Sequence, residues 1–321
     1  MRPVSLPEVP YSATAVRPGW NDLPHTVRDA IGSRLGGLVT AVTSAGGGFT
    51  RAFAALLATA AGDRVFVKAA PLSDPVSGWY EREAAITASL PSGVRAARPR
   101  WTLTEAGYFV LCLDAIDGRV PELPWTAGEL DAALRAWRAA AAALARPPAE
   151  LLAIGLPWLP DLIRDDLSEW TAIAAGQSRL PTTSSWVPER LDELAALERA
   201  LPALAAGSGM LHGDLRLDNV MIDRTGDAWL CDWTWPCLGA PWFDTVMLLV
   251  SAYASGLDVD RLLEPWGAPA EGVDGALAAL GGYWLVRAAS GPSSASPHSR
   301  QHQRFSGEQA LSWLASRRGW S

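Results

Sequence analysis

Residues 210–222 read MLHGDLRLDNVMI, and they carry the most informative pattern in the chain. An apolar pair leads into His-Gly-Asp, which ends at Asp214, Asn219 follows five residues later, and an apolar triplet closes the stretch. A turn and a second short apolar run then lead to Asp232. Apolar runs on both sides of a turn predict a β-hairpin. Asp214 would lie at its entry and Asp232 at its exit, so two acids and an amide would lie close together.

Two acids and an amide in this arrangement suit phosphoryl transfer. One aspartate accepts or orients the proton of the acceptor hydroxyl, while an asparagine and a second aspartate hold the magnesium that bridges the phosphates. Magnesium prefers hard oxygen ligands and keeps several waters, so an amide oxygen with one or two carboxylates is a suitable donor set. The structural alternative is an ordinary hairpin whose Asp and Asn residues cap turns. An ordinary hairpin would form without this particular spacing of the two acids and the amide.

The basic residues single out one position. The chain has 26 arginines and one lysine, Lys68, which lies near the end of the apolar run 65–69. Arginine does not replace lysine where a compact point charge is needed. An interior lysine also needs an acidic partner, because unpaired burial is costly. Glu83, in a helix predicted over 79–90, is the first candidate for that partner and Glu81 is the second.

A glycine cluster lies between two predicted strands, upstream of the lysine. It contains Ser44, Gly46, Gly47 and Gly48. Glycines at such a place allow backbone N–H groups to approach phosphates closely. A simple hairpin turn explains the cluster equally well.

The motif His-Gly-Asp-Leu-x-x-x-Asn, followed by an apolar strand and an Asp-Trp pair, resembles the catalytic and metal-binding segments of aminoglycoside phosphotransferases and their small-molecule kinase relatives. The resemblance spans about residues 38–255. It implies that Asp214 is the catalytic base, that Asn219 is a magnesium ligand, and that Asp232 corresponds to the aspartate opening the kinase Asp-Phe-Gly motif. The Trp and Thr that follow depart from that motif, which counts more against a eukaryotic-type protein kinase than against this family.

The same resemblance implies a nucleotide site in the first part of the chain. Lys68 would pair with the α- and β-phosphates of ATP or GTP and with Glu83, and the glycine cluster would cover the nucleotide. The backbone carbonyl of Asp114 and the amide of Ile116 would hydrogen-bond the purine at an inter-lobe hinge. Asp244 matches a family aspartate that braces the catalytic loop.

The expected fold is α+β, a protein-kinase-like arrangement of two lobes. A strand-rich, nucleotide-binding N-lobe would span residues 1–117, and a helix-rich lobe for catalysis and acceptor binding would span 118–321. The pattern predicts strands over 38–43, 49–57, 64–69, 100–103 and 108–113. It predicts helices over 79–90, 127–145, 189–205, 243–255 and 273–290. The Ser/Pro/Gly-rich segment 290–298 reads as a flexible surface loop.

Composition argues against several other classes of protein. No apolar run approaches the length of a membrane span, and the N-terminus does not read as a signal peptide. Three scattered cysteines are too few for a disulfide framework or a zinc site, which favours a cytoplasmic protein. Residues 119–321 carry a net charge of −8, which argues against nucleic acid and would suit a cationic acceptor.

Three hypotheses about function follow. The leading one is O-phosphorylation of an antibiotic or other natural product, and the second is phosphorylation of a primary metabolite such as an amino alcohol or sugar. A non-catalytic nucleotide-binding scaffold is the third. The acceptor would be a small molecule, cationic or sugar-containing, held near the C-lobe helices. Acidic residues that would attract a cation are Asp165, Asp166, Glu169, Asp258, Asp260 and Glu264.

Overall fold

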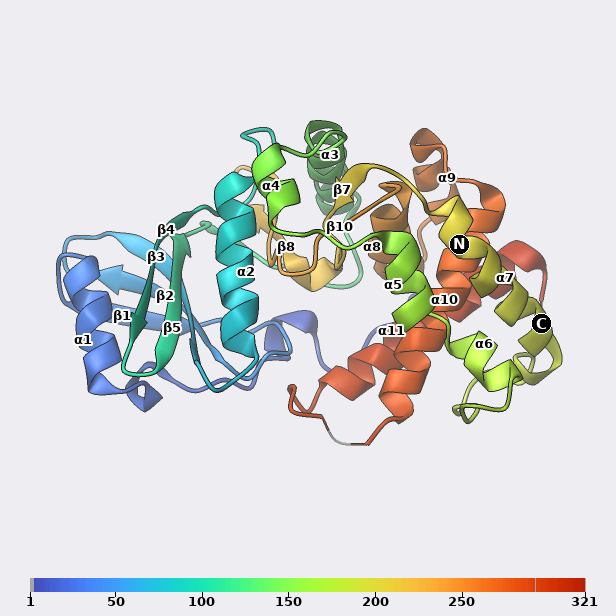
Figure 1. Ribbon diagram of the computed structural model, residues 1–321, viewed down its shortest axis with the longest axis horizontal. Helices are drawn as coiled ribbons and strands as arrows, with labels where there is room; N and C mark the ends of the chain where they lie inside the picture. The colour runs from blue at the N-terminus through green and yellow to red at the C-terminus, as the bar shows by residue number, and fades with distance from the viewer. Residues whose placement is uncertain (1–2, 292, 321) are drawn as a thin grey trace.

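The first lobe is built on a five-stranded antiparallel sheet, in the computed structural model that describes residues 3–291 and 293–320 (Figure 1). The strand order is β1-β2-β3-β5-β4. The strands are β1 (Val39–Ser44), β2 (Phe53–Thr59), β3 (Arg64–Pro71), β4 (Pro99–Glu105) and β5 (Tyr108–Asp114). The α+β, kinase-like fold predicted from the sequence is confirmed. In the structure the second strand begins four residues later than predicted, because residues 46–52 form the loop before it.

One helix covers each face of this sheet. Helix α1 (His25–Arg34) places Val27 and Ile31 on one face, and α2 (Val76–Ser89) covers the other. Alternate residues of a strand point to opposite faces. Val67 of β3 therefore faces the α1 side, and its neighbour Lys68 faces α2. The alternation of β3 thus directs the only lysine of the chain toward the helix that carries Glu83.

Two small sheets lie between the lobes. Strand β8 (Val220–Asp223) pairs with β9 (Ala228–Leu230), which confirms the hairpin predicted from the sequence. Strand β6 (Gly118–Arg119) pairs with the other edge of β8. Strands β7 (Gly209–Leu211) and β10 (Cys237–Gly239) form the second sheet. The polar loop between β7 and β8 is thereby held between short strands at both ends.

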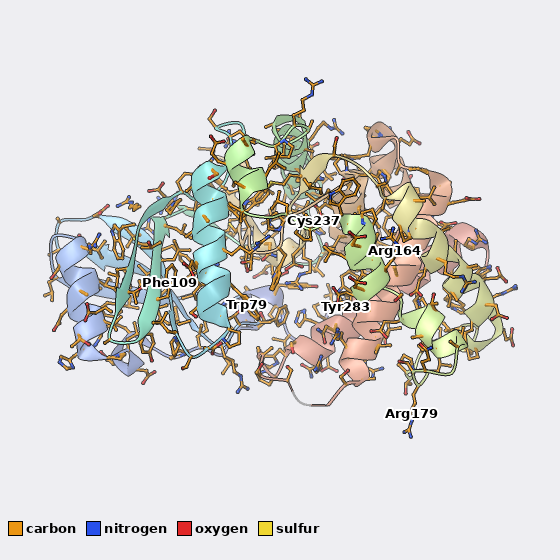
Figure 2. The ribbon with its side chains drawn as sticks, in the orientation of Figure 1. Trp79, Phe109, Arg164, Arg179, Cys237 and Tyr283 are labelled. Atoms are coloured by element: carbon orange, nitrogen blue, oxygen red, sulfur yellow. The ribbon has the colours of Figure 1, made fainter. Side chains whose placement is uncertain are left out.

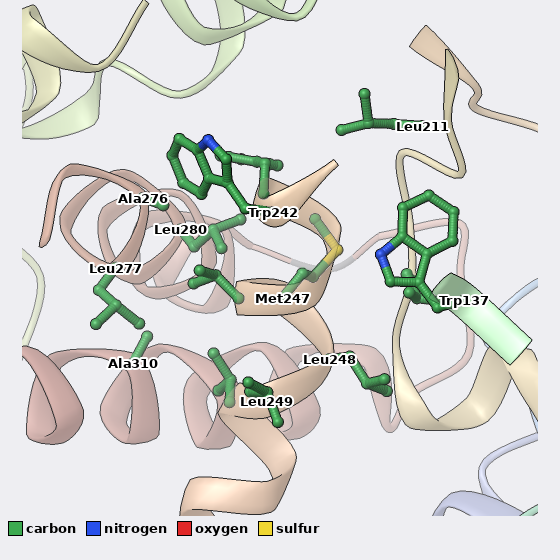
Figure 3. Close-up of a cluster of buried hydrophobic side chains, with 14 of the residues drawn as sticks. Trp137, Leu211, Trp242, Met247, Leu248, Leu249, Ala276, Leu277, Leu280 and Ala310 are labelled. Atoms are coloured by element: carbon green, nitrogen blue, oxygen red, sulfur yellow. The ribbon is translucent and has the colours of Figure 1, made fainter. Parts of the chain in front are cut away.

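The second lobe is helical. Its helices are α3 (Ala127–Ala143), α4 (Ala149–Ala153), α5 (Leu159–Asp166), α6 (Glu169–Ala174), α7 (Leu191–Leu204), α8 (Trp242–Ala254), α9 (Val259–Leu263), α10 (Ala270–Ala289) and α11 (Ser299–Arg318). Every residue of α8 is buried, and α8 packs against α10 and α11 in the core shown in Figure 3. The predicted helices of this lobe are confirmed within a few residues. Helices α4, α5, α6, α9 and α11 are elements that we did not predict.

One segment near the N-terminus connects the lobes in addition to the hinge. The N-terminal end of the chain lies on the second lobe, whereas α1 lies at the far end of the first (Figure 1). The amide of Ser5 donates to the carbonyl of Ala254 at 2.8 Å, and the amide of Ala15 donates to the carbonyl of Gly46 at 2.8 Å. Residues 3–17 are therefore a strap that joins both lobes. The division of the chain at residue 117 stays a prediction.

The segment 290–298 differs from the surface loop that we expected. Ser296 is buried, its amide donates to the carbonyl of Phe49 at 2.7 Å, and its hydroxyl donates to the carbonyl of Thr14 at 2.6 Å. Residue 292 lies outside the described residues. The expectation of a surface loop is wrong for Ser296, because a Ser/Pro/Gly-rich composition does not reveal that the segment packs under the strap. None of the described helices has the length and apolar character needed to cross a membrane.

Candidate active site

The loop between β7 and β8 is organised by a buried histidine. His212 is fully buried, its ring Nε2 hydrogen-bonds the carbonyl of Cys231 at 2.8 Å, and the amide of Asp214 hydrogen-bonds its Nδ1 at 3.3 Å. Burial lowers the pKa of His212 to about 4. A neutral ring with its proton on Nε2 satisfies both bonds. His212 is therefore a structural link between the two sides of the hairpin.

Asp244 braces the same loop from α8. Its carboxylate accepts the amide of His212 at 2.6 Å and the amide of Gly213 at 3.2 Å. Gly213 has φ +79°, and a Cβ at this position would collide with the carbonyl of Trp235. The Gly in His-Gly-Asp is thus required by the backbone. This geometry matches the bracing position that the resemblance implied for Asp244.

Asp214 and Asn219 meet at the mouth of this loop. The Asn219 amide nitrogen donates to the backbone carbonyl of Asp214 at 2.8 Å and to its Oδ2 at 3.1 Å. Arg216 lies 3.3 Å from Asp214 and 3.1 Å from Asp218. Burial, with the charges of Asp218 and Asp232, raises the pKa of Asp214 to about 7, although Arg216 acts in the opposite direction. A carboxyl with such a pKa is suited to exchange a proton near neutral pH.

Lys68 lies between two carboxylates. Its Nζ donates to Oε2 and Oε1 of Glu83 at 2.6 and 2.9 Å, and it lies 3.6 Å from Oδ1 of Asp232. Burial alone would lower the pKa of Lys68, but the two carboxylates outweigh it and raise the pKa above its usual value. Glu83, rather than the exposed Glu81, is the residue against the lysine. The lysine is thus held charged and fixed in direction.

Asp232 adopts an unusual backbone conformation. Its φ is +61°, in the left-handed region that non-glycine residues seldom occupy. Such conformations cost about 1–3 kcal/mol and concentrate at functional sites. Thr234 supports the side chain by donating its hydroxyl to Oδ1 at 2.7 Å. The side chain is 43 % exposed and therefore open to the cleft.

One cleft of about 840 Å³ brings five of the eleven predicted site residues together. Its lining includes Lys68, Asp214, Asn219, Asp232 and Gly48. The other predicted positions do not line it: Ser44, Gly46, Gly47, Asp114 and Ile116 lie elsewhere. Glu83 reaches the cleft only through Lys68.

The two hinge positions border a separate hollow. Asp114 binds Arg100 through its carboxylate at 2.8 Å, and its amide donates to the carbonyl of Arg98. The amide of Ile116 donates to no acceptor among residues 3–291 and 293–320. Purine binding by these two residues stays a prediction.

The glycine cluster is required by a packing contact that the sequence did not reveal. A Cβ on Gly46 would collide with the carbonyl of Ser12, and a Cβ on Gly47 would come within 2.9 Å of the carbonyl of Tyr11. The strap thus packs directly on these two glycines. Gly48, with φ +98°, is the member of the cluster that reaches the cleft.

The polar atoms of the cleft fit a magnesium ion. The amide nitrogen of Asn219 is committed to Asp214, and its oxygen accepts no hydrogen bond from any residue in the described part of the chain. Oδ2 of Asp232 is likewise free of described partners, since Thr234 and Lys68 bind Oδ1. Two hard oxygen atoms on one cleft wall suit a cation that also takes phosphate and water ligands.

The sequence and fold can now be compared with known proteins. Residues 42–283 match the phosphotransferase enzyme family, APH. The chain belongs to this family. A comparison with curated protein sequences found no match.

Several solved structures share the fold of this chain at low sequence identity. A ternary complex of a thermostable aminoglycoside phosphotransferase APH(4)-Ia mutant with ADP and hygromycin B has a TM-score of 0.62 at 14 % identity, over 90 % of this chain and 98 % of that one. Macrolide 2'-phosphotransferase MphH from Brachybacterium faecium has a TM-score of 0.55 at 15 % identity, over 87 % and 97 %. A fructosamine-3-kinase, so assigned by its description, from Haemophilus somnus has a TM-score of 0.55 at 12 % identity, over 89 % and 97 %.

Sequence reasoning missed three residues that line the cleft. Arg216 joins Asp214 to Asp218, and its guanidinium lies 5.6 Å from the ring of Phe49 in the glycine loop. Asp218 is almost fully buried, with its Oδ1 unpaired within the described residues. Both charges lie inside the 210–222 stretch, so their position between Asp214 and Asn219 was the available signal. Phe49 directly follows the glycine cluster, but no pattern linked it to the catalytic loop.

Proposed function

We propose that this protein transfers the γ-phosphate of a nucleoside triphosphate to a hydroxyl group of a small molecule. The observation that carries the proposal is the convergence of two pairs on one cleft. Lys68 with Glu83 comes from the first lobe, and Asp214 with Asn219 comes from the second. A scaffold that only bound nucleotide would have no need of an aspartate whose pKa is raised to about 7 beside the binding site.

Each residue has a distinct part in the proposed reaction. Lys68, held by Glu83, binds and orients the phosphates of the donor. Asp214 accepts a hydrogen bond from the acceptor hydroxyl, aligns it for in-line attack, and takes its proton as the bond to phosphorus forms. Asn219 and Asp232 would hold magnesium, which would supply positive charge to offset that of the donor phosphates. Positioning and electrostatics supply most of the rate in reactions of this type.

Arg216 completes the proposed machinery. It lies between Asp214 and Asp218, so its charge is fixed at the point where the acceptor and the γ-phosphate would meet. A fixed guanidinium there stabilises negative charge that develops during transfer. The same ion pairs hold Asp214 in one orientation toward the cleft.

We infer a natural product, such as an antibiotic, as the acceptor. Two of the structural neighbours are an aminoglycoside and a macrolide phosphotransferase, and they support this class by shared fold alone. The neighbour described as a fructosamine kinase favours a primary metabolite as the second candidate. ADP, AMP-PNP and GDP occur in the neighbours, which supports a nucleoside triphosphate as the donor.

The test is nucleoside diphosphate release with ATP and GTP across a library of hydroxylated antibiotics, sugars and amino alcohols. We expect at least one acceptor to stimulate release, and Asp214→Ala to reduce kcat by about 10²-fold or more while nucleotide affinity changes little. Asp161→Asn, an exposed carboxylate outside the cleft, is the matched control. Full acceptor-dependent turnover by Asp214→Ala would contradict its assignment as the base.

A further inference from the structure

A second hollow opens beside the nucleotide cleft. It has a volume of about 720 Å³ and is bounded by α2 of the first lobe and by α5, α8 and α10 of the second. Asp214, Arg216 and Trp235 line both hollows, so the two meet at the carboxylate proposed as the base. An acceptor in this second hollow would place a hydroxyl against Asp214. The volume is within the range of sites for small ligands.

Most of the second hollow is apolar. Side chains from α5, α8 and α10 form its walls, among them Leu162, Phe243, Met247, Leu280, Tyr283 and Trp284. An exposed aromatic pair stands at the border with the nucleotide cleft, where the rings of Trp79 and Trp235 are 5.4 Å apart in an edge-to-face arrangement. In Figure 2, Trp79 on α2 and Tyr283 on α10 lie on opposite sides of the space between the lobes. Such a lining favours an acceptor with an apolar or aromatic body.

The fixed charges of the second hollow are mainly positive. Arg82 donates to the backbone carbonyls of Thr234 and Gly155 at 3.2 and 3.4 Å, and no described carboxylate lies within salt-bridge distance of it. Arg287 is exposed and lies 5.2 Å from the ring of Tyr283, also without a carboxylate at that distance in the described chain.

The acidic residues that we expected to attract a cation lie mostly elsewhere. Of the six candidates, only Asp166 lines the second hollow. Asp260 is paired with Arg317 on the far side of the lobe. Glu169 acts on Arg287 electrostatically but lies beyond salt-bridge distance. Apart from Asp214, whose charge Arg216 offsets, the walls therefore present two arginines and one aspartate.

These charges select between acceptors of different sign. An ammonium group in the second hollow would lose hydration against apolar walls and face Arg82 and Arg287, which is unfavourable. A carboxylate would instead gain charge-assisted hydrogen bonds from a guanidinium, which presents a planar fork of donors. Arg287 has its donors free within the described structure, whereas some of the N–H groups of Arg82 already donate to the two carbonyls.

We infer that, given the proposed kinase activity, the acceptor is an amphipathic alcohol with an apolar or aromatic body and a single anionic group that Arg287 binds. The apolar body lies between the aromatic pair and α10, and the hydroxyl reaches Asp214. A polycationic aminoglycoside is disfavoured by the same walls. This inference differs from the cationic acceptor that the acidic second half of the chain predicts, because net charge does not report the charge of one pocket.

The experiment compares three probes that share one biphenyl alcohol body and carry an anionic, a neutral or a cationic group at the far end. They are 4'-(hydroxymethyl)biphenyl-4-carboxylate, the matching 4-carboxamide and the matching 4-aminomethyl compound, with hygromycin B as a polycation. Dissociation constants are measured by calorimetry on the full chain with ADP and magnesium. We expect the carboxylate to bind about fivefold or more tightly than the amide, and the amine to bind more weakly than the amide.

Arg287→Gln should weaken binding of the carboxylate about fivefold or more and leave binding of the carboxamide unchanged. Arg164→Gln on α5, where the arginine pairs with Asp161 outside the second hollow, is the matched control and should change neither. Equal binding of all three probes, tighter binding of the amine, no binding by any probe at millimolar concentration, or an equal effect of Arg287→Gln on every probe would overturn the inference.

A turnover measurement separates this inference from the proposed function. Phosphorylation of hygromycin B with no effect of Arg287→Gln would leave the kinase proposal standing and overturn the charge inference. Arg287-dependent binding of the carboxylate, without phosphate transfer to any acceptor, would support the charge of the ligand and overturn the kinase proposal.

Discussion

At the residue scale, the cleft depends on charges held at short range by partners that leave them little freedom. The side chain of Lys68 is only 11 % exposed and donates hydrogen bonds to both carboxylate oxygens of Glu83. Asp214 is oriented by Asn219 and Arg216. Holding catalytic groups in the correct orientation before the substrate binds is a large part of enzymatic rate enhancement. Substitutions that preserve charge but change shape should therefore be harmful.

Lys68→Arg should lower kcat/KM for the nucleotide by about tenfold or more. The planar guanidinium is larger than the ammonium group, and the space between Glu83 and Asp232 holds Nζ at 2.6 and 3.6 Å from their oxygens. Steady-state kinetics with varied ATP measures the effect. Arg64→Lys, the reverse exchange at an exposed end of the same strand, is the control. Wild-type kinetics in Lys68→Arg would refute the argument from the solitary lysine.

The acidic limb of the pH profile of kcat/KM should have its midpoint near pH 7. The pKa of Asp214 is raised to about 7, so the carboxyl becomes protonated, and unable to accept a proton, as pH falls through that value. Asp218→Asn removes a negative charge that raises the pKa of Asp214. It also removes the ion pair between Arg216 and Asp218, so that Arg216 pairs with Asp214 only. The limb should then move to lower pH. An unchanged midpoint in Asp218→Asn, with Asp161→Asn as the reference, would exclude this origin of the pKa shift.

At the element scale, the glycine loop is held by the strap rather than free to close as a lid. Arg17 donates to the carbonyls of Gly47 and Ala52 at 2.9 and 3.2 Å. His302 of α11 hydrogen-bonds the carbonyl of Val9 at 2.8 Å. Two elements far apart in the sequence, the N-terminal strap and α11, thus position the loop over the cleft. Damage to the strap should therefore be felt both in stability and in nucleotide binding.

Gly46→Ala should reduce the free energy of unfolding by about 1–3 kcal/mol and weaken nucleotide binding. A Cβ at this position meets the carbonyl of Ser12, so the strap or the loop must shift. Gly37→Ala, where a Cβ meets nothing within 4 Å, is the matched control and should leave stability nearly unchanged. Thermal unfolding and nucleotide titration measure the two effects. Equal stability of both variants would show that the strap does not constrain the loop.

At the scale of the whole molecule, the cleft joins the two lobes through side chains that each lobe contributes separately. Lys68 and Glu83 belong to the sheet and α2, whereas Asp214, Asn219 and Asp232 belong to the loops around the β8–β9 hairpin. A ligand that touches both sets binds only the folded protein. By mass action it should stabilise the native state by about 2.7 kcal/mol at 100 times its Kd.

ATP with magnesium should therefore raise Tm by several degrees, and removal of magnesium with EDTA should cancel much of the gain. Asp232→Asn should lose much of the magnesium-dependent part, because it replaces a negatively charged carboxylate ligand of the cleft by a neutral amide. Asp227→Asn, an exposed acid in the hairpin turn, is the control and should keep the full effect. A magnesium-dependent shift of wild-type size in Asp232→Asn would argue against its assignment as a ligand.

The success of the sequence analysis followed from how local each signal is. Asp214, Asn219 and Asp232 lie within one hairpin and its flanking loops, so their spacing alone predicts that they meet. Lys68 and Glu83 come together because the alternation of residues along a strand and the periodicity of a helix are both short-range patterns. The glycine cluster was read correctly as a loop but not as the site where the strap packs. Helix α11 was missed because little in its sequence separates it from a polar surface segment.

The family, the two-lobed α+β fold and the polar residues that converge on the cleft could be predicted from the sequence, since each is encoded in a short motif with regular spacing. Three-dimensional packing was needed to show that residues 3–17 hold the glycine loop and that Ser296 is buried beneath them. It also decided the charge of the second hollow, whose walls come from α2, α5, α8 and α10. Composition averages charge over the whole chain, whereas packing selects which few side chains face a ligand.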